Sequence, residues 1–141
     1  MALKIGINGF GRIGRMVLRS IIENNRKDIE VVAINNRSNS EVSSFLLQHD
    51  TIHGKLKAEI NHSDKAIEIN GKKISIINET EILKINWKKH EVDIVLECTG
   101  KFNTKEKSAQ HINSGAKKVL VSAPCKGAIN IIFGVNQKTL K

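Results

Sequence analysis

A glycine-rich turn near the amino terminus constrains the fold of this chain more than any other feature. Residues 3–8 read LKIGIN, a short run of mostly branched apolar side chains that predicts a β-strand. The next six residues read GFGRIG, and apolar residues then recur at helical spacing from Ile13 to Ile22. Three arginines fall on the opposite helix face: Arg12, Arg15 and Arg19. A strand that runs through Gly-x-Gly-x-x-Gly into a helix is typical of a dinucleotide-binding turn.

Each glycine of that turn has its own physical role in such a site. Gly9 permits the tight turn, Gly11 lets the backbone approach a pyrophosphate, and Gly14 lets the helix pack closely on the strand. The helix N-terminus supplies free N–H groups and a positive dipole to the phosphates. The alternative is a glycine-rich turn without a ligand, which the strand–turn–helix context disfavours.

The remaining pattern predicts a mostly parallel α/β sheet. Residues 29–34 (IEVVAI) form a nearly continuous apolar run, typical of a strand buried on both faces. With the preceding strand and helix this run completes a strand–helix–strand unit, whose crossover is expected to be right-handed. A second helix is predicted over residues 40–47. Further strands are predicted over three stretches: 92–97, 118–122 and 131–135.

A third helix is predicted between two of these strands. Asn103 and Glu106 have the spacing of a capping box, with Asn in place of Ser or Thr. Gly115 is placed to end the helix that this box would begin.

One hairpin interrupts the parallel pattern. Asn70-Gly71 lies between the alternating runs 66–69 and 73–76, and Asn-Gly in that context is the strongest short signal for an antiparallel hairpin. The sequence therefore predicts one domain over residues 1–141. Its expected architecture is a Rossmann-like, doubly wound and mostly parallel α/β sheet with an antiparallel excursion.

Composition limits the classes of protein to which the chain can belong. No stretch approaches ~18 uninterrupted apolar residues, so no membrane span is expected. The short apolar run at the amino terminus soon turns polar and does not predict a signal peptide. Two cysteines, Cys98 and Cys125, cannot build a disulfide scaffold, which favours a reducing, cytoplasmic compartment.

The charge balance is basic, with 23 Lys and Arg against 14 Asp and Glu and a net charge of +9. Such a balance favours anionic partners in general. The lysines occur in scattered pairs with no interleaved aromatic residues, so nucleic acid is not expected as a partner. Lys, Ile and Asn are all abundant, and an AT-rich genome explains that bias without a selected basic surface.

The ribose-reading position departs from the usual dinucleotide fingerprint. An acidic residue is expected ~20 residues beyond the glycine turn, at the end of the second strand. Asn35, Asn36 and Arg37 occupy that place, and no carboxylate is present. An asparagine amide accepts one hydroxyl hydrogen bond but does not repel a 2′-phosphate, which Arg37 would neutralise unless it points to solvent. The predicted cofactor is therefore NAD or NADP, with dual specificity.

The run at residues 5–15, IGINGFGRIGR, closely resembles the opening of glyceraldehyde-3-phosphate dehydrogenase. It is far more specific than Gly-x-Gly-x-x-Gly alone, and the resemblance continues in order along the whole chain. The further matching segments are VAIN at 32–35, DTIHG at 50–54, ECTGKF at 97–102, GAKKV at 115–119, SAP at 122–124 and GVN at 134–136.

This resemblance implies cofactor contacts residue by residue. The backbone of Arg12 and Ile13 is expected to meet the pyrophosphate. Four residues are implied to lie along the nicotinamide half: Thr99, Gly100, Phe102 and Ser122. The candidate cofactor-binding residues are Asn8, Gly9, Phe10, Gly11, Arg12, Ile13, Gly14, Asn36, Arg37, Thr80, Thr99, Gly100, Phe102 and Ser122.

Two of these positions depart from the family pattern. Asn36 stands where NAD-specific members usually carry aspartate, which puts a strict preference for NAD in doubt. Thr80 stands where many members carry an arginine near the adenine, which suggests a slightly weaker adenine clamp.

The resemblance also implies which parts of the enzyme this chain lacks. The family's nucleophilic cysteine lies in a run shortly beyond residue 141, and its partner histidine, substrate-phosphate groups and C-terminal helix lie further on. We therefore expect an incomplete dinucleotide-binding domain, without catalytic residues or the catalytic second domain, that is inactive in isolation. For the full enzyme the resemblance implies a sugar-phosphate aldehyde substrate, hydride transfer to nicotinamide through a cysteine thioester, and a homotetramer.

Two alternative functions stay open at this point. A relative that oxidises erythrose 4-phosphate shares this half of the fold, and the absent substrate domain would separate the two activities. The chain can also be a fragment that binds a dinucleotide or another polyanion without catalysis.

The remaining reactive side chains favour structural roles. Cys98 follows an apolar strand and is expected to be a small buried side chain, whereas Cys125 lies in a loop and is expected to be exposed. His49 and His53 have the i,i+4 spacing of metal ligands on a helix. The likeness of residues 50–54 to the family loop favours a structural role for these histidines, and no metal site is expected.

Overall fold

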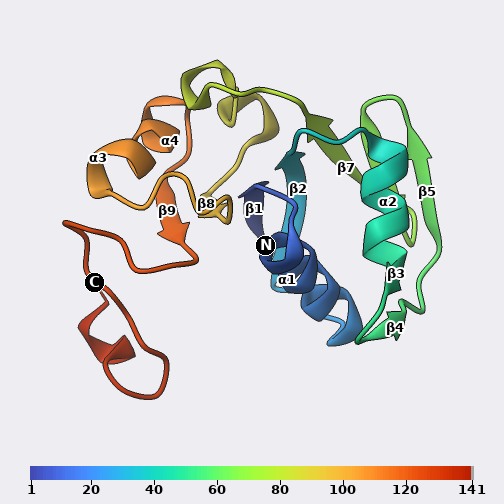
Figure 1. Cartoon of the computed structure of the whole chain (residues 1–141), viewed down its shortest axis with the longest axis horizontal. Coiled ribbons are helices and arrows are strands. Elements are labelled where there is room, and N and C mark those ends of the chain that lie inside the picture. Colours follow the sequence, from blue (N-terminus) through green and yellow to red (C-terminus); the bar gives the residue numbers. More distant parts are fainter. Residues whose placement is uncertain (141) are drawn as a thin grey trace.

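Strand β1 (Leu3–Asn8) lies inside the sheet and has a parallel neighbour on each side. The computed structural model describes residues 1–140, and its main sheet has seven strands in the order β5-β6-β7-β2-β1-β8-β9 (Figure 1). The other strands of this sheet are β2 (Ile29–Asn35), β5 (Ile60–Ser63), β6 (Ala66–Ile69), β7 (Lys72–Ile77), β8 (Ile94–Glu97) and β9 (Lys118–Val121). A separate two-stranded ribbon pairs β3 (His49–Asp50) with β4 (Gly54–Lys55).

The strand directions confirm the doubly wound α/β prediction. Strands β7, β2, β1, β8 and β9 run parallel, and β6 runs antiparallel to its two neighbours, β5 and β7. Asn70 and Gly71 have φ of 50° and 81°, which is the left-handed conformation that a tight hairpin turn requires. The excursion is one strand longer than predicted, since β5 adds to β6 at the sheet edge.

Helices and apolar clusters cover the two faces of this sheet. Helix α1 (Arg12–Glu23) and helix α2 (Ser40–Gln48) place Leu18 and Leu47 in one buried cluster with Ile5 and Ile7 of β1. The other face carries a second cluster around Trp87. The short helices are α3 (Lys105–Ser108), α4 (Gln110–Asn113), and the 3₁₀ segments η1 (Ile82–Lys84), η2 (Lys88–His90) and η3 (Gln137–Thr139).

The predicted capping box at Asn103 is wrong. Thr104 is the N-cap of α3 and its hydroxyl oxygen accepts a hydrogen bond from the backbone N–H of Lys107 at 3.3 Å. The Asn103 amide instead donates to the carbonyl oxygen of Gly100 at 3.1 Å, which ties it to the preceding loop. Gly115 does follow α4 with φ of 106°, as predicted for a C-terminal glycine.

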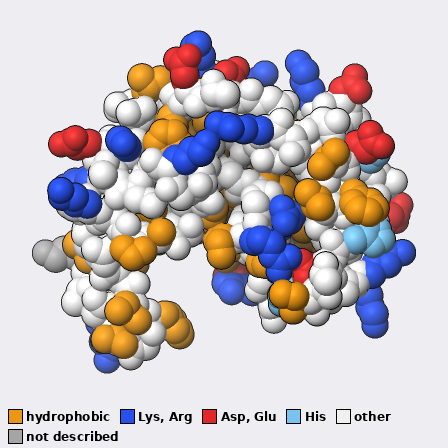
Figure 2. All heavy atoms as spheres, viewed as in Figure 1, with side chains coloured by type: hydrophobic (Ala, Val, Ile, Leu, Met, Phe, Trp, Pro, Cys, Tyr) orange, Lys and Arg blue, Asp and Glu red, His pale blue; other side chains and the backbone are white. Residues whose placement is uncertain are grey.

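The strand predicted over residues 131–135 is also wrong, because this stretch forms turns that lead into η3. The Asn136 side chain accepts a hydrogen bond from the Ile132 N–H at 2.6 Å and donates to the Asn130 carbonyl at 3.0 Å. These bonds satisfy the backbone locally, so no sheet partner is needed. Figure 2 shows hydrophobic side chains on this segment, where Phe133 is 92% exposed.

Within residues 1–140, no helix has the combination of length and apolar character that a membrane crossing requires.

We expect Gly14→Ala to destabilise the fold by ~2 kcal/mol through overpacking. A Cβ at Gly14 would collide with the carbonyl oxygen of Gly9 and press on the Ile7 side chain, because α1 crosses the β1 turn at that point. Urea unfolding followed by circular dichroism measures the loss. The matched control is Gly11→Ala: a Cβ there meets no atom within 4 Å, so the expected loss is below ~1 kcal/mol. Equal losses for the two variants would refute this packing role.

Candidate functional site

An open cleft lies at the carboxyl ends of the central parallel strands. It has a volume of about 260 Å³, and its floor includes the turn that connects β1 to α1. Strands β2 and β8 flank β1 on opposite sides, so the chain reverses its order across the sheet here. Ligands of open α/β sheets bind in the crevice outside the strand ends at such a switch point.

A chain of buried amides ties the strand ends together beneath the cleft. The Asn8 side chain is 2% exposed and donates to the Glu97 carboxylate at 2.7 Å. Its amide oxygen accepts a hydrogen bond from the Asn35 amide at 2.8 Å. Asn35 also exchanges hydrogen bonds of 2.9 Å with the backbone N–H and carbonyl oxygen of Glu79. The ends of β1, β2 and β8 and the segment after β7 are thereby joined through side chains.

The Glu97 carboxylate is the central acceptor of this chain. Glu97 is 0% exposed, and one of its oxygens accepts from both the backbone N–H and the hydroxyl of Thr99, at 2.9 and 2.6 Å. The other oxygen lies 2.6 Å from Nε2 of His111. Burial raises the pKa of the Glu97 carboxyl, but the hydrogen bonds from His111, Asn8 and Thr99 outweigh this and leave that pKa lowered.

The tautomer of His111 follows from its second hydrogen-bond partner, Trp87. Trp87 Nε1 lies 3.0 Å from Nδ1 of His111, and an indole N–H can only donate a hydrogen bond. Nδ1 must therefore accept, so Nε2 carries the hydrogen and donates to Glu97. The imidazole in this arrangement is neutral, which leaves an ionised carboxylate stabilised by neutral donors alone. The Phe102 ring meets His111 edge-on at a centroid distance of 6.5 Å.

The N-terminus of α1 opens into the cleft. Gly11 is its N-cap and has no side-chain cap, and a Cβ at this position would meet no atom within 4 Å. Gly9 adopts φ of 93°, and a Cβ there would lie 2.8 Å from the Thr99 side chain. Uncapped N–H groups beside open space form a ready site for an anion.

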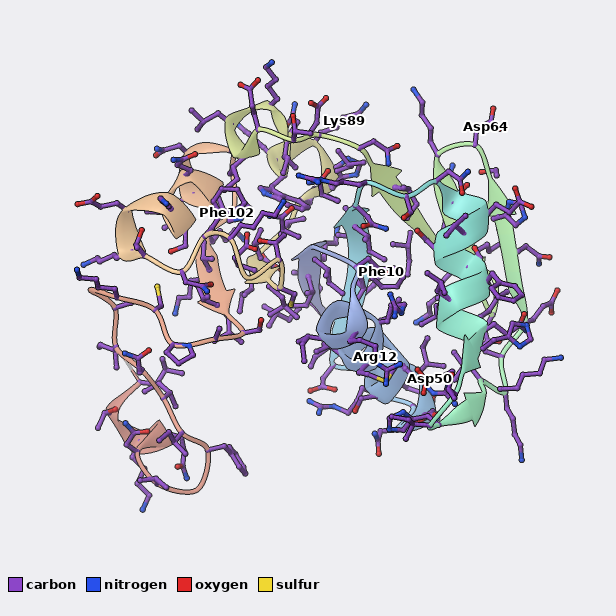
Figure 3. All side chains as sticks on the ribbon, in the orientation of Figure 1. Phe10, Arg12, Asp50, Asp64, Lys89 and Phe102 are labelled. Atoms are coloured by element: carbon purple, nitrogen blue, oxygen red, sulfur yellow. The ribbon has the colours of Figure 1, made fainter. Side chains whose placement is uncertain are left out.

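The Arg12 side chain forms an ion pair with Asp50, whose carboxylate is almost fully buried (Figure 3). The backbone N–H of His53, aided by the His53 ring, Arg12 and the Ile52 N–H, holds the pKa of Asp50 well below its usual range despite burial. Arg19 fixes the same loop, since its guanidinium donates to the carbonyl oxygens of Gly54 at 2.8 Å and His53 at 2.9 Å. Arg19 is 3% exposed, so the helix face opposite the apolar residues is buried at this position.

The cleft collects most of the predicted cofactor residues. Those that line it are Asn8, Gly9, Phe10, Gly11, Asn36, Arg37, Thr80, Thr99 and Phe102. Arg12 and Ile13 begin α1, and Gly14 is buried one residue further on. Gly100 follows Thr99 with φ of 73° but is not part of the lining.

Ser122 lies in a different hollow from Phe102, although the resemblance placed both along one half of the cofactor. Ser122 follows β9, where its backbone N–H donates to the Glu97 carbonyl oxygen at 3.0 Å. Its side chain lines an apolar groove with Cys125 and Ile131. The Phe102 ring instead shares the main cleft with Asn36 and Thr80.

The structure adds cleft residues that were not among the predicted cofactor contacts. They are Asn35, Glu79, Ile82, Ile85, Cys98 and Lys101. Cys98 and Lys101 are sequence neighbours of predicted cofactor contacts, and this proximity could have identified them as cleft residues. Ile82 lies in η1 and Ile85 is its C-cap. No hydrophobic periodicity in the sequence predicts this short segment.

The expected exposure of Cys125 is wrong, and Cys98 is only partly as buried as expected, although it packs against the core. Cys125 is the buried cysteine, at 5% exposure, and Cys98 is half-buried at the cleft. Burial raises the pKa of the Cys98 thiol, which keeps it protonated and poorly nucleophilic. His49 ends α2 as its C-cap while His53 hydrogen-bonds Asp50, and the chain up to residue 140 holds no cluster of three metal-ligating side chains.

Comparison of the sequence with known protein families identifies the family of this chain. A sequence profile described as "Glyceraldehyde 3-phosphate dehydrogenase, NAD binding domain" matches residues 3–105, which is more than half of the chain. The chain belongs to this family. Nicotinamide dinucleotide is accordingly its cofactor class.

Individual relatives agree with the family assignment. The glyceraldehyde-3-phosphate dehydrogenase of Cereibacter sphaeroides is 47% identical over 141 residues, covering 99% of this chain and 42% of the relative. The enzyme of Geobacillus stearothermophilus is 46% identical over 138 residues, covering 97% and 41%. Glyceraldehyde-3-phosphate dehydrogenase 1 of Giardia intestinalis is 44% identical over 140 residues, covering 99% and 41%. The chain thus spans about two fifths of the length of these curated relatives.

Replacing the buried carboxylate should destabilise the domain in a pH-dependent way. We expect Glu97→Gln to cost ~3 kcal/mol at pH 7, because a glutamine NH₂ would face the donors of Asn8 and His111. The lowered pKa of Glu97 means that its stabilisation is present above ~4.3, the ordinary glutamate pKa, and is lost as the pH falls through the folded value. Urea unfolding at several pH values measures both effects.

The control for this experiment is Glu91→Gln, which removes a carboxylate that is 76% exposed and paired with Lys4 at 2.6 Å. A much smaller change is expected there, since exposed ion pairs contribute little. A gap between parent and Glu97→Gln that stays constant as the pH is lowered would contradict the ionised state of Glu97.

Proposed function

We propose that the cleft binds a nicotinamide dinucleotide with its pyrophosphate at the N-terminus of α1. The observation that carries this proposal is the open space beside Gly11 together with the uncapped helix terminus. Two negatively charged phosphates match the free N–H groups and the positive end of the helix dipole. The dinucleotide, when bound, supplies a nicotinamide ring that accepts a hydride.

The lining residues favour the adenosine half in the main cleft. Asn36 and Arg37 follow β2, where the ribose of a dinucleotide is read. Phe102, Ile82 and Ile85 add apolar surface to the same cleft, which suits a planar base. The nicotinamide half then extends past Gly11 toward Ser122. This assignment places Phe102 at the adenosine end, in contrast to the expectation from the resemblance.

The whole protein is proposed to be a phosphorylating glyceraldehyde-3-phosphate dehydrogenase. The relatives that support this bear that name, and the alternative of an erythrose-4-phosphate enzyme receives no support from them. Its substrate would be a sugar-phosphate aldehyde, handled by residues outside this incomplete cofactor domain. We extend to it the homotetramer implied by the resemblance, and the free state of both cysteines supports a reducing, cytoplasmic location.

The binding proposal predicts that Gly11→Val abolishes dinucleotide binding. A branched Cβ would occupy the space that the pyrophosphate needs beside the turn. Isothermal titration of the 141-residue chain with NAD measures the heat in the parent and the variant. Ser20→Val, an exposed position toward the other end of α1, serves as the matched control and should leave the heat unchanged. Undiminished binding by Gly11→Val would refute the proposed phosphate site.

The activity proposal predicts that the 141-residue chain alone does not oxidise glyceraldehyde 3-phosphate. Its half-buried Cys98 has a raised pKa, and no described base is positioned to activate it. Absorbance at the NADH band, with aldehyde, phosphate and NAD present, gives the readout. Turnover that disappears in Cys98→Ser or Cys125→Ser would show that this half of the protein carries a nucleophile of its own.

A further inference from the structure

We propose that His111 is a positioning residue for the dinucleotide, which sets the affinity of the cleft by holding Thr99 in place through Glu97. The inference rests on the proposed function, because it concerns the affinity of the same cleft. His111 is 0% exposed and is not one of the cleft-lining residues, whereas Thr99 lines the cleft. Any effect of His111 on a bound ligand must therefore pass through other residues.

A chain of hydrogen bonds connects His111 to the cleft surface. Nε2 of His111 lies 2.6 Å from one Glu97 oxygen, and the other oxygen accepts from the Thr99 hydroxyl at 2.6 Å. The Thr99 hydroxyl oxygen in turn accepts a hydrogen bond from the Lys101 N–H at 3.1 Å. Because a hydroxyl carries a single hydrogen, the Thr99 side chain has one orientation as long as Glu97 stays in place.

The position of Thr99 bears on the turn that is proposed to receive the pyrophosphate. A Cβ on Gly9 would lie 2.8 Å from Cγ2 and 2.9 Å from the backbone nitrogen of Thr99, so Thr99 packs directly against this turn. Gly11, two residues further on, is the N-cap of α1. A displaced Thr99 would release the turn and the N–H groups beside it. A less ordered site binds an anion less tightly, because the cost of ordering it is paid on binding.

Trp87 fixes the other side of the imidazole. Its indole N–H donates to Nδ1 of His111 at 3.0 Å, which leaves the imidazole hydrogen on Nε2, facing Glu97. The indole ring is itself held against β1, since a Cβ on Gly6 would come within 2.8 Å of Trp87 Cζ3. His111 is therefore placed between an indole packed on β1 and the carboxylate at the end of β8.

The two nitrogens of His111 can be replaced one at a time. An asparagine oxygen takes the place of Nδ1 and keeps the bond to Trp87, but it leaves Glu97 without this donor. A glutamine amide nitrogen takes the place of Nε2 and keeps the bond to Glu97. We expect His111→Asn to weaken NAD binding about tenfold, as for the loss of an outer-shell partner of a binding site. His111→Gln should stay within threefold of the parent. Isothermal titration of the 141-residue chain with NAD measures both.

Trp87 provides an independent spectroscopic readout, because it is the only tryptophan of the chain. The cross-peak of its indole N–H in a proton–nitrogen correlation spectrum reports the bond to residue 111. The peak should stay near its parent position in His111→Asn and move upfield in His111→Gln, where the acceptor is lost. The variant that keeps the Trp87 bond is thus expected to be the one that loses NAD affinity.

Val92→Ala is the matched control for a loss of stability alone. Val92 is 1% exposed and belongs to the same buried cluster as Trp87, but its side chain has no hydrogen-bonding group. The truncation should lower the urea midpoint and leave the NAD affinity within twofold of the parent. Equal losses of affinity in Val92→Ala and His111→Asn would mean that His111 only stabilises the fold, and would overturn the inference.

Thr99→Val tests the cleft end of the same chain of bonds and decides the matter if His111→Asn does not fold. It removes the hydroxyl that Glu97 holds and should also weaken NAD binding several-fold. Undiminished NAD binding in Thr99→Val, or in a folded His111→Asn, overturns this inference and leaves the proposed function intact. Equal losses in His111→Asn and His111→Gln overturn it as well. A parent chain that binds no NAD overturns the proposed function, and this inference with it.

Discussion

The cleft depends on one buried ionised carboxylate at the end of β8. Glu97 is fully buried, yet its hydrogen-bond donors are all neutral: the amide of Asn8, the imidazole of His111, and the N–H and hydroxyl of Thr99. A buried charge is tolerated only when such donors replace its hydration. The donors come from three places in the chain, so the requirement to stabilise one charge fixes the relative positions of β1, β8 and α4.

The hydrogen bonds around Glu97 also position side chains at the surface of the cleft. Thr99 is held by Glu97 and in turn packs against the backbone of Gly9, where a Cβ would come within 2.8 Å of it. Phe102 meets the edge of His111, so the apolar wall is set by the same network. The turn that would receive the pyrophosphate and the wall that would receive the base are therefore positioned by one set of hydrogen bonds.

The sequence predicted the features that depend on local conformation. The glycine turn and the Asn70-Gly71 hairpin are such features, because their positive φ values restrict the residues that fit. The errors fell where individual side-chain hydrogen bonds, near or distant in the sequence, decide the outcome. Arg19 looks polar on a helix face until the loop carbonyls at 53 and 54 bury it, and residues 131–135 look like a strand until Asn136 satisfies their backbone. The burial of Cys125 likewise follows from contacts that no periodicity records, since its N–H donates to the Asn130 side chain and the next residue, Lys126, bridges to Thr104.

The residues that build the cleft are separate from those proposed to select its ligand. Asn8, Asn35 and Glu97 are buried and mutually bonded, so a change at any of them leaves donors or acceptors unsatisfied in the interior. Asn36 and Arg37 lie one and two residues beyond β2, outside that network, and the Arg37 side chain is exposed. Substitution at Arg37 removes no hydrogen bond of the described structure, and substitution at Asn36 removes at most its part-buried bond to the Ser43 hydroxyl. We therefore expect substitutions at these two proposed ribose-reading positions to cost less stability than substitutions at Asn8, Asn35 or Glu97.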